Sequence, residues 1–192
     1  MKTIGLIGGM SWESSSEYYK IINETVKERL GGLHSAKCIM YSVDFEEIAS
    51  LQHQGEWEEL TKLMINFAQQ LEGAGADFIV ICTNTMHKMA REVQDNINIP
   101  LLHIADATGE KIIEQGLGKP GLLGTKFTME EDFYKQRLKE KYSINVIIPS
   151  YADREIIDSV IYNELCLGIL KQSSKKKFKK LLKNLFQLAQ MD

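Results

Sequence analysis

The sequence has few cysteines, no long apolar run and no excess of positive charge. Its three cysteines, at positions 38, 82 and 166, lack the spacing of a metal site, and an odd number suits a reducing cytoplasm better than a set of disulfides. No apolar stretch approaches the roughly 20 residues of a membrane-spanning helix. The net charge of -3 gives no reason to expect nucleic acid, whose binding proteins usually carry a basic face. These absences predict a cytoplasmic protein with no metal, nucleic-acid or membrane partner.

The amino terminus does not have the pattern of a secretory signal. Residues 1–8 contain one charged side chain and an apolar stretch too short for a signal peptide. The composition, with 44% hydrophobic and 26% charged residues, is typical of a globular protein, and no linker, low-complexity segment or short repeat interrupts it. The length of 192 residues suits one domain or two small ones.

Strand-like and helix-like segments alternate along the whole chain. Apolar runs that end in glycine or polar residues predict strands, and apolar residues at helical spacing predict helices. The predicted strands cover residues 3–7, 36–43, 78–82, 100–104, 121–125 and 144–148. The predicted helices cover residues 14–30, 57–71, 84–94, 106–115, 128–141, 153–167 and 174–189. Capping boxes at Ser14–Glu17 and Thr128–Glu131 predict the starts of two of these helices.

This alternation predicts an α/β fold. Strands that alternate with helices of this length are typical of βαβ units and a mainly parallel sheet. A strand that ends in small residues before a capped helix occurs near residue 3 and again near residue 120, which indicates a duplicated architecture. We therefore expect two domains, residues 1–98 and residues 99–192, each with its own sheet.

The run that ends in Cys82 is the part of the chain best suited to chemistry. A cysteine at the carboxyl end of a parallel strand, just before a helix, can be held as a reactive thiolate. The following Thr83, Asn84 and Thr85 offer backbone N–H groups, two hydroxyls and an amide, which suit a small carboxylate. The helix terminus would also lower the pKa of the thiol. The alternative is a structural role, because free cysteine is among the most buried residue types.

Other candidate residues have structural readings as well. Gly5 to Gly9 has neither the G-x-G-x-x-G spacing nor the lysine of a nucleotide loop, so a tight turn, or backbone near a small anion, is the better reading. His87 could pair with Cys82, but a capping or packing histidine is favoured. Asp106 could face the same cleft or cap a helix.

Three further features are predicted to be structural. Cys38 lies within a strand, and Cys166 lies on the apolar face of a helix. The lysine run at residues 175–180 should form the solvated side of the last helix. The opposite side of that helix would be apolar and contains Phe178, Leu181, Leu182, Leu185 and Leu188.

Taken together, several stretches resemble the aspartate/glutamate racemase family of cofactor-independent amino-acid racemases, and within it the broad-specificity branch. The resemblance covers residues 1 to about 174, and the run from Cys82 to Thr85 is its most specific part. The stretches that carry it are Ile4 to Ser14, Gly31 to Ala36, Ser42 to Phe45, Cys82 to Lys88, His103 to Thr108, Leu122 to Thr125 and Glu164 to Gly168.

The resemblance implies a fold, a site and a reaction. The fold would be two Rossmann-like parallel-sheet α/β domains related by a pseudo-two-fold axis, with the active site between them and commonly a homodimer. In this family, two cysteines transfer protons on opposite faces of the Cα of a small amino acid without a cofactor. Cys82 matches the first cysteine. The residues matched to substrate binding are Met10, Ser11, Gln52, Thr83, Asn84, Thr85 and Thr125.

The sequence also departs from the family pattern. The family's second cysteine lies in a Gly-Cys-Thr-Glu run, and no such run occurs before Asp192. We therefore expect the second domain to be incomplete, through truncation or a frameshift, and the chain to associate and to exchange the α-proton on one face only. No arginine or lysine pair for a distal carboxylate is evident, which disfavours aspartate. A single-cysteine decarboxylase or isomerase, and a non-catalytic paralogue that binds carboxylates, are the alternatives.

Overall fold

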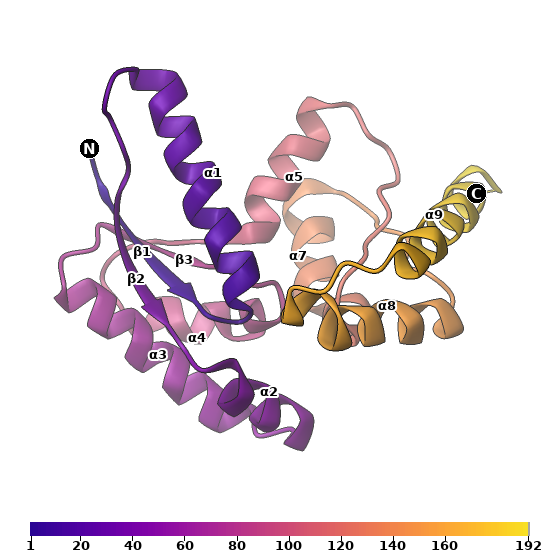
Figure 1. Cartoon of the computed structure of the whole chain (residues 1–192), viewed down its shortest axis with the longest axis horizontal. Helices are drawn as coiled ribbons and strands as arrows, with labels where there is room; N and C mark the ends of the chain where they lie inside the picture. Colours follow the sequence, from indigo (N-terminus) through magenta and orange to yellow (C-terminus); the bar gives the residue numbers. More distant parts are fainter. Residues whose placement is uncertain (192) are drawn as a thin grey trace. The chain divides into compact units, whose positions relative to one another are not determined.

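Parallel strand pairing organises the first part of the chain. In a computed structural model, which describes residues 1–191, the chain divides into two compact units, Met1–His103 and Ile104–Asp192. The first unit contains a four-stranded parallel sheet in the order β2-β1-β3-β4 (Figure 1). The strands are β1 (Thr3–Gly8), β2 (Lys37–Ser42), β3 (Phe78–Ile81) and β4 (Leu101–Leu102). The prediction of an α/β fold with parallel strands is confirmed.

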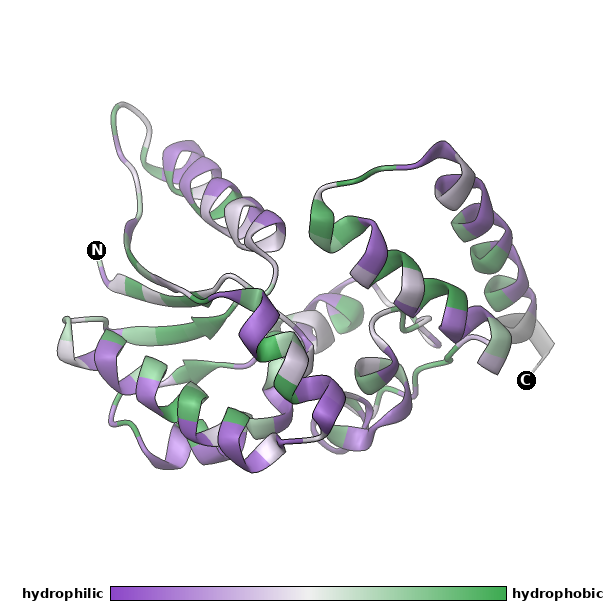
Figure 2. Ribbon diagram, turned by 60° about the horizontal axis from the view of Figure 1, so that its bottom comes forward, coloured by the Kyte–Doolittle hydropathy of each residue, from purple (hydrophilic) through white to green (hydrophobic). Residues whose placement is uncertain are grey.

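Helices cover both faces of this sheet. They are α1 (Trp12–Leu30), α2 (Phe45–Gln54), α3 (Trp57–Gly73), the 3₁₀ helix η1 (Thr85–Met89) and α4 (Ala90–Asp95). Helix α1 lies on one face, and α3 and α4 lie on the other (Figure 1). Figure 2 shows that the strands between them are mostly apolar, as parallel strands buried on both faces should be.

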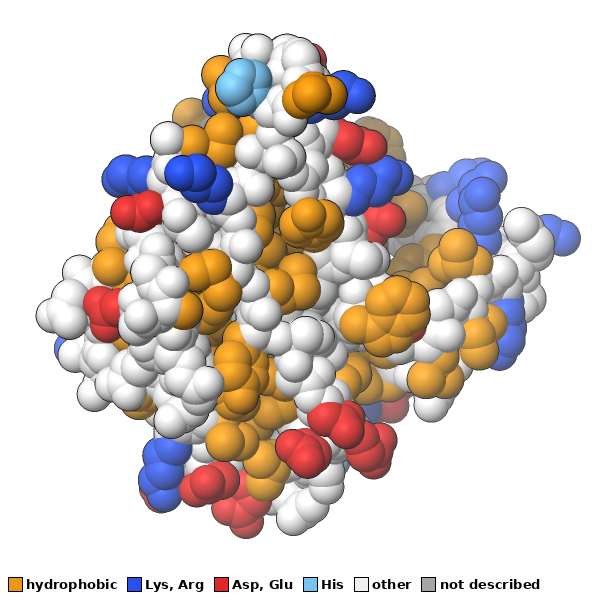
Figure 3. All heavy atoms as spheres, turned by 60° about the vertical axis from the view of Figure 1, so that its left-hand side comes forward, with side chains coloured by type: hydrophobic (Ala, Val, Ile, Leu, Met, Phe, Trp, Pro, Cys, Tyr) orange, Lys and Arg blue, Asp and Glu red, His pale blue; other side chains and the backbone are white. Residues whose placement is uncertain are grey.

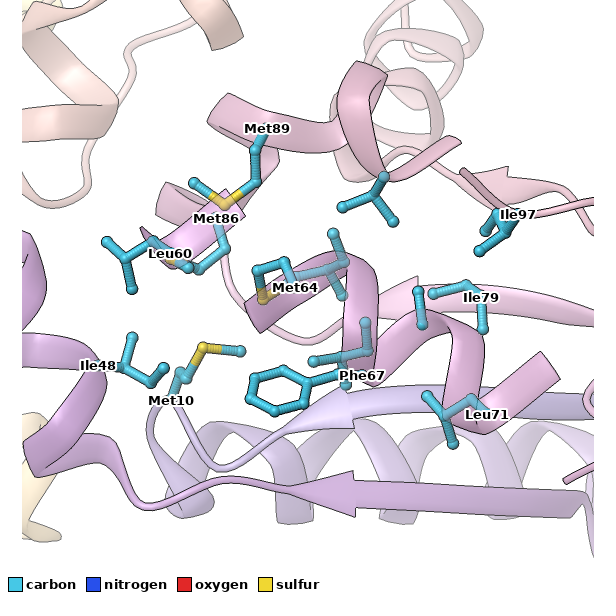
Figure 4. Close-up of a cluster of buried hydrophobic side chains, with 14 of the residues drawn as sticks. Met10, Ile48, Leu60, Met64, Phe67, Leu71, Ile79, Met86, Met89 and Ile97 are labelled. Atoms are coloured by element: carbon cyan, nitrogen blue, oxygen red, sulfur yellow. The ribbon is translucent and has the colours of Figure 1, made fainter. Parts of the chain in front are cut away.

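The main core of the first unit lies on the α3 side of the sheet. Side chains from β3, α3 and η1 form one apolar cluster there, in which Ile79, Leu60 and Met86 are completely buried (Figure 4). The helical period of α3 produces this face, because Leu60, Met64 and Leu71 recur at spacings of four and seven residues. The predicted helix at residues 57–71 is confirmed.

The α1 side is covered less completely. Only Ser15 of the 19 residues in α1 is fully buried, whereas Trp12, Tyr19 and Leu30 are half exposed or more. Apolar side chains are correspondingly visible at the molecular surface (Figure 3). A hydroxyl in the first turn of α1, on Ser14, contacts the carbonyl of Cys82, a residue that is completely buried.

The helix starts differ from the predicted capping boxes. The N-cap of α1 is Ser11, three residues before the predicted Ser14, so the predicted capping box was wrong. The Ser14 hydroxyl donates instead to the Cys82 carbonyl (3.4 Å), while Ser15 accepts a hydrogen bond from Gly9 N–H (2.8 Å) and donates one to the Ser11 carbonyl (3.0 Å). Helix α2 was not predicted, since only Ile48 and Gln52 of its ten residues are buried.

The second unit is mainly helical. Its helices are α5 (Ile104–Glu114), α6 (Lys126–Glu130), α7 (Asp132–Tyr142), α8 (Tyr151–Asn163), the 3₁₀ helix η2 (Leu165–Leu167) and α9 (Gln172–Met191). Helices α5 and α7 pack around Ile112 and Leu138, and α6, α8 and α9 pack around Met129, Ile157 and Leu181. An ion pair also joins α5 to α7, because Arg137 binds the Asp106 carboxylate with two hydrogen bonds of 2.6 and 2.8 Å.

The two strands predicted in the second unit are reduced to one parallel bridge, between Gly121 and Ile147. Hydrogen bonds from Leu122 N–H to the Ile147 carbonyl (2.8 Å) and from Ile147 N–H to the Pro120 carbonyl (3.0 Å) hold it. The predicted extents, 121–125 and 144–148, were therefore wrong for the described residues. Two neighbouring segments without a third strand make too few pairs for a regular sheet.

The helix that follows the bridge also starts earlier than predicted. The N-cap of α6 is Thr125, whose Oγ1 accepts a hydrogen bond from Thr128 N–H (3.3 Å), so the predicted capping box at Thr128 was wrong. At the junction of the units, β4 pairs with β3 and belongs to the first sheet. The units accordingly divide after His103, whereas the sequence-based boundary lies after residue 98.

The lysine-rich run forms the polar side of α9, as predicted. All five lysines of residues 175–180 are exposed, and Leu181 and Leu185 are buried. Leu182 is 48% exposed, so its assignment to the buried face was wrong, and the side chain of Leu188 is outside the described residues. Of the helices in residues 1–191, none combines the length and the apolar character that crossing a membrane requires.

Candidate active site

The carboxyl ends of β1 and β3 bring the candidate site together. The two strands are neighbours and run parallel, with Ile7 opposite Ile81. The Cys82 N–H donates to the Ile7 carbonyl (2.9 Å), which extends the pairing one residue past β3. The loop that follows Gly8 and the segment that begins at Cys82 therefore start at the same edge of the sheet, as expected for adjacent parallel strands.

The glycines of the first loop are required by close packing. A Cβ on Gly8 would lie 2.7 Å from Ser15 Oγ, and a Cβ on Gly9, whose φ is +91°, would lie 2.3 Å from the Val43 carbonyl oxygen. The Gly9 N–H already donates to Ser15. Of the readings open for this loop, the structure supports the tight strand-to-helix turn.

Cys82 is completely buried on the α1 side of the sheet. Ile79 and Ile81 pack on the α3 side, so the alternation along the strand directs Cys82 to the opposite face. Cys38 lies on the same face, since its neighbour Ile39 packs on the α3 side. The Ser14 hydroxyl of α1 donates to the Cys82 carbonyl (3.4 Å).

Burial, and to a lesser extent the nearby Cys38, raise the pKa of Cys82 to about 12. The prediction of a lowered pKa was wrong. The helix that follows is a five-residue 3₁₀ helix that begins three residues later, and its N-cap Asn84 makes no side-chain capping bond. A dipole of that size does not offset the removal of a thiolate from water. At neutral pH the thiol of Cys82 is therefore protonated.

The predicted carboxylate-binding residues adjoin Cys82. Thr83 and Asn84 are half-buried, and Thr85 is buried as the first residue of η1. Thr83 is therefore the first residue with an accessible side chain after the end of β3. The structure places all three in one short segment at the carboxyl edge of the sheet.

Two histidines that the sequence did not bring together are in contact beside this segment. The rings of His87 and His103 are 4.5 Å apart and tilted by 59°, and both are buried. His87 Nδ1 also lies 2.7 Å from the Thr83 carbonyl oxygen. The reading of His87 as a packing residue fits this position. The contact could have been predicted from one feature of the sequence: each histidine follows closely after the end of a strand, and the two strands are neighbours in the sheet.

The remaining ionisable candidates are structural. The Asp106 carboxylate binds Arg137 and Lys141, and these partners lower the pKa of its carboxyl. Cys166 is half-buried in η2. Within residues 1–191, no group of three or more histidine, cysteine or acidic side chains could hold a metal ion.

Comparison with known proteins identifies the family. Residues 7–191 match the profile of the Asp/Glu/hydantoin racemase family. The chain belongs to this family. The match extends through α9, beyond residue 174, where the resemblance was expected to end. The prediction of an aspartate/glutamate racemase relative is thereby confirmed.

Two curated racemases are similar to the chain. The broad-specificity amino-acid racemase RacX of Bacillus subtilis is 29% identical over 141 residues, which are 71% of this chain and 60% of RacX. The glutamate racemase of Streptococcus agalactiae is 27% identical over 155 residues, which are 74% of this chain and 57% of that enzyme. The chain thus spans about 60% of the length of these relatives.

Two solved structures are more similar to the chain in sequence than these two racemases are. A Yersinia pestis protein described as an Asp/Glu racemase is 53% identical, with a TM-score of 0.88 over 98% of this chain and 82% of that one. An aspartate racemase homologue from Pyrococcus horikoshii is 40% identical, with a TM-score of 0.75 over 89% of this chain and 74% of that one. The α/β fold described above is therefore a racemase fold.

The other residues matched to the racemase site have local roles. Met10 is buried in the apolar cluster, pointing toward the same region as Ile48 (Figure 4). Ser11 is the N-cap of α1, and Gln52 is buried and donates from Nε2 to the sulfur of Met86 (3.1 Å). Thr125 caps α6 in the second unit. Met10, Ser11 and Gln52 thus belong to the first unit and Thr125 to the second.

Proposed function

We propose that this chain acts in a cofactor-independent amino-acid racemase, in which Cys82 transfers a proton to or from the Cα of a small amino acid. Membership of the Asp/Glu/hydantoin racemase family supports the reaction class. The single observation that supports the site is the position of Cys82, which directly follows β3 and directly precedes Thr83, Asn84 and Thr85. A homodimer in the cytoplasm is part of the same proposal.

The proposed chemistry explains why polar groups surround this position. The Cα–H of an amino acid is a very weak acid, so its removal requires a positioned base and stabilisation of the carbanionic charge. Without a cofactor, hydrogen-bond donors to the substrate carboxylate must supply that stabilisation. The hydroxyls of Thr83 and Thr85 and the amide of Asn84 are suitable donors at the right place in the chain.

The protonation state of Cys82 suits it to donate a proton to the substrate Cα. With a pKa of about 12 the group rests as a thiol, and the thiol is the form that delivers a proton. At pH 7 only about one molecule in 10⁵ carries the thiolate, as five pKa units dictate. For Cys82 to remove a proton, its side chain must first become less desolvated. Either the bound substrate or a local movement that admits water would have to bring this about.

Complete burial of Cys82 also favours a second candidate, a family member that binds small carboxylates without turnover. In that case the polar residues 83–85 would hold a carboxylate while the thiol stays inaccessible. A single-cysteine decarboxylase or isomerase has no comparable observation in its favour.

Proton NMR in heavy water, combined with chiral chromatography, separates these possibilities. Each enantiomer of a set of small amino acids is incubated with the full chain, with Cys82→Ala and with Thr83→Val, which retains the shape of threonine without its hydroxyl. The proposal predicts that the wild type exchanges the Cα proton with retention of configuration, because Cys82 serves one face only, and that Cys82→Ala loses this exchange. Binding of amino acids by calorimetry with no exchange would support the second candidate. Loss of exchange in Thr83→Val with retention of exchange in Cys82→Ala would move the proton-transfer role away from Cys82.

A further inference from the structure

His87 makes a hydrogen bond that defines its tautomer. Its Nδ1 lies 2.7 Å from the carbonyl oxygen of Thr83, four residues earlier in the chain. A carbonyl oxygen can only accept, so Nδ1 carries the hydrogen and donates it. The ring is 3% exposed, which shields this bond from competing water.

His103 restrains the ring of His87 from the neighbouring strand. It is the first residue after β4, and its ring is 4.5 Å from that of His87 at an angle of 59°. Its exposed fraction is 7%, so both rings pack within the same buried region. Since β3 and β4 pair in parallel, this contact ties the ring orientation of His87 to the sheet.

The Thr83 carbonyl belongs to the same planar peptide unit as the Asn84 N–H. In a trans peptide these two groups point in opposite directions. Holding the carbonyl toward the buried His87 therefore directs the Asn84 N–H away from it. Without the histidine, a partly buried carbonyl would lack this donor, and the peptide unit could rotate.

We propose that His87 is a positioning residue for the racemase: through the Thr83 carbonyl, it fixes the peptide unit between the proton-transferring Cys82 and the carboxylate-binding Asn84. The proposal rests on the function proposed above. His87 itself does not contact the substrate in this account. Its effect is on the orientation of the segment from residue 82 to residue 84, and a displacement of about 1 Å in such a segment costs roughly a hundredfold in rate.

Three substitutions of His87 test this role, because they differ in where they place a hydrogen-bond donor or in whether they have one. Asparagine places an amide nitrogen near the position of Nδ1, glutamine places it near that of Nε2, and leucine removes the donor. We expect His87→Leu and His87→Gln to lose about 10²-fold in the rate of α-proton exchange in heavy water, whereas His87→Asn should remain within about fivefold of the wild type. A purely structural role would not rank asparagine above glutamine.

Two controls keep the test independent of folding and of the proposed function. The ¹⁵N resonances of His87 in the wild type report the tautomer directly, and a protonated Nε2 with a bare Nδ1 would overturn the proposal. If the wild type exchanges the α-proton and all three variants do so at the same rate, the role of His87 is overturned and the proposed function is not. A wild-type chain that exchanges no amino acid would overturn the proposed function together with this role. Tryptophan fluorescence during urea unfolding shows whether each variant retains the fold.

Discussion

The burial of Cys82 makes a quantitative prediction about stability at alkaline pH. The pKa of its thiol rises from an ordinary value of 9.0 to about 12 in the folded chain. Between these values the unfolded chain releases the proton and the folded chain keeps it. The free energy of unfolding therefore falls as the pH rises through this window, by at most about 1.4 kcal/mol per pH unit. From pH 9 to pH 11 we expect Cys82 to account for a loss of about 2 kcal/mol.

Urea unfolding of the wild type and Cys82→Ala measures this loss. At pH 7 the variant should be less stable by about 1 kcal/mol, because a small buried side chain is removed. By pH 11 the wild type should have lost about 2 kcal/mol more than the variant, so their order reverses. Trp12 and Trp57 both lie in the first unit, so fluorescence reports the unit that contains Cys82.

Buried tyrosines also ionise late, but they do not affect the comparison. Burial raises the pKa of Tyr134 and of Tyr162, and both residues are present in the two proteins. They cancel in the difference between wild type and variant. Identical pH dependence of the two proteins would show that Cys82 is not desolvated and would refute the reasoning.

Two further predictions concern packing and charge. Gly9→Ala should lower the free energy of unfolding by about 3 kcal/mol or more, and its control Gly75→Ala by about 1 kcal/mol, because both glycines have positive φ but only Gly9 lacks room for a Cβ. Asp106→Asn should cost about 1 kcal/mol at pH 7 by circular dichroism. Its two cationic partners lower the pKa of Asp106, so this stabilisation is present above about pH 4 and the two proteins should converge in more acidic solution.

Local patterns in the sequence were sufficient to predict most of the first sheet. The run from Phe78 to Ile81 is continuously apolar and three of its four residues are β-branched, and such runs are typical of parallel strands buried on both faces. The lysines of α9 were likewise predictable from helical periodicity. These features depend on residues that are close together in the sequence.

Features set by distant residues could not be predicted in the same way. The pKa of Cys82 depends on its burial and on Cys38, which lies in β2, two strands away in the sheet. The contact between His87 and His103 depends on the pairing of β3 with β4. For Cys82, the local sequence suggested a lowered pKa, and burial in the folded chain raises it instead.

The most direct test of the account is α-proton exchange in heavy water, followed by proton NMR of the substrate. The wild-type chain should exchange the Cα proton of a small amino acid, and Cys82→Ala should reduce the initial rate by at least about 10²-fold. Where Cys82 removes the proton, the rate should rise about tenfold per pH unit between pH 7 and pH 9, since the thiolate fraction rises in that proportion below a pKa of about 12. Exchange by Cys82→Ala at the wild-type rate would contradict the assignment of proton transfer to Cys82.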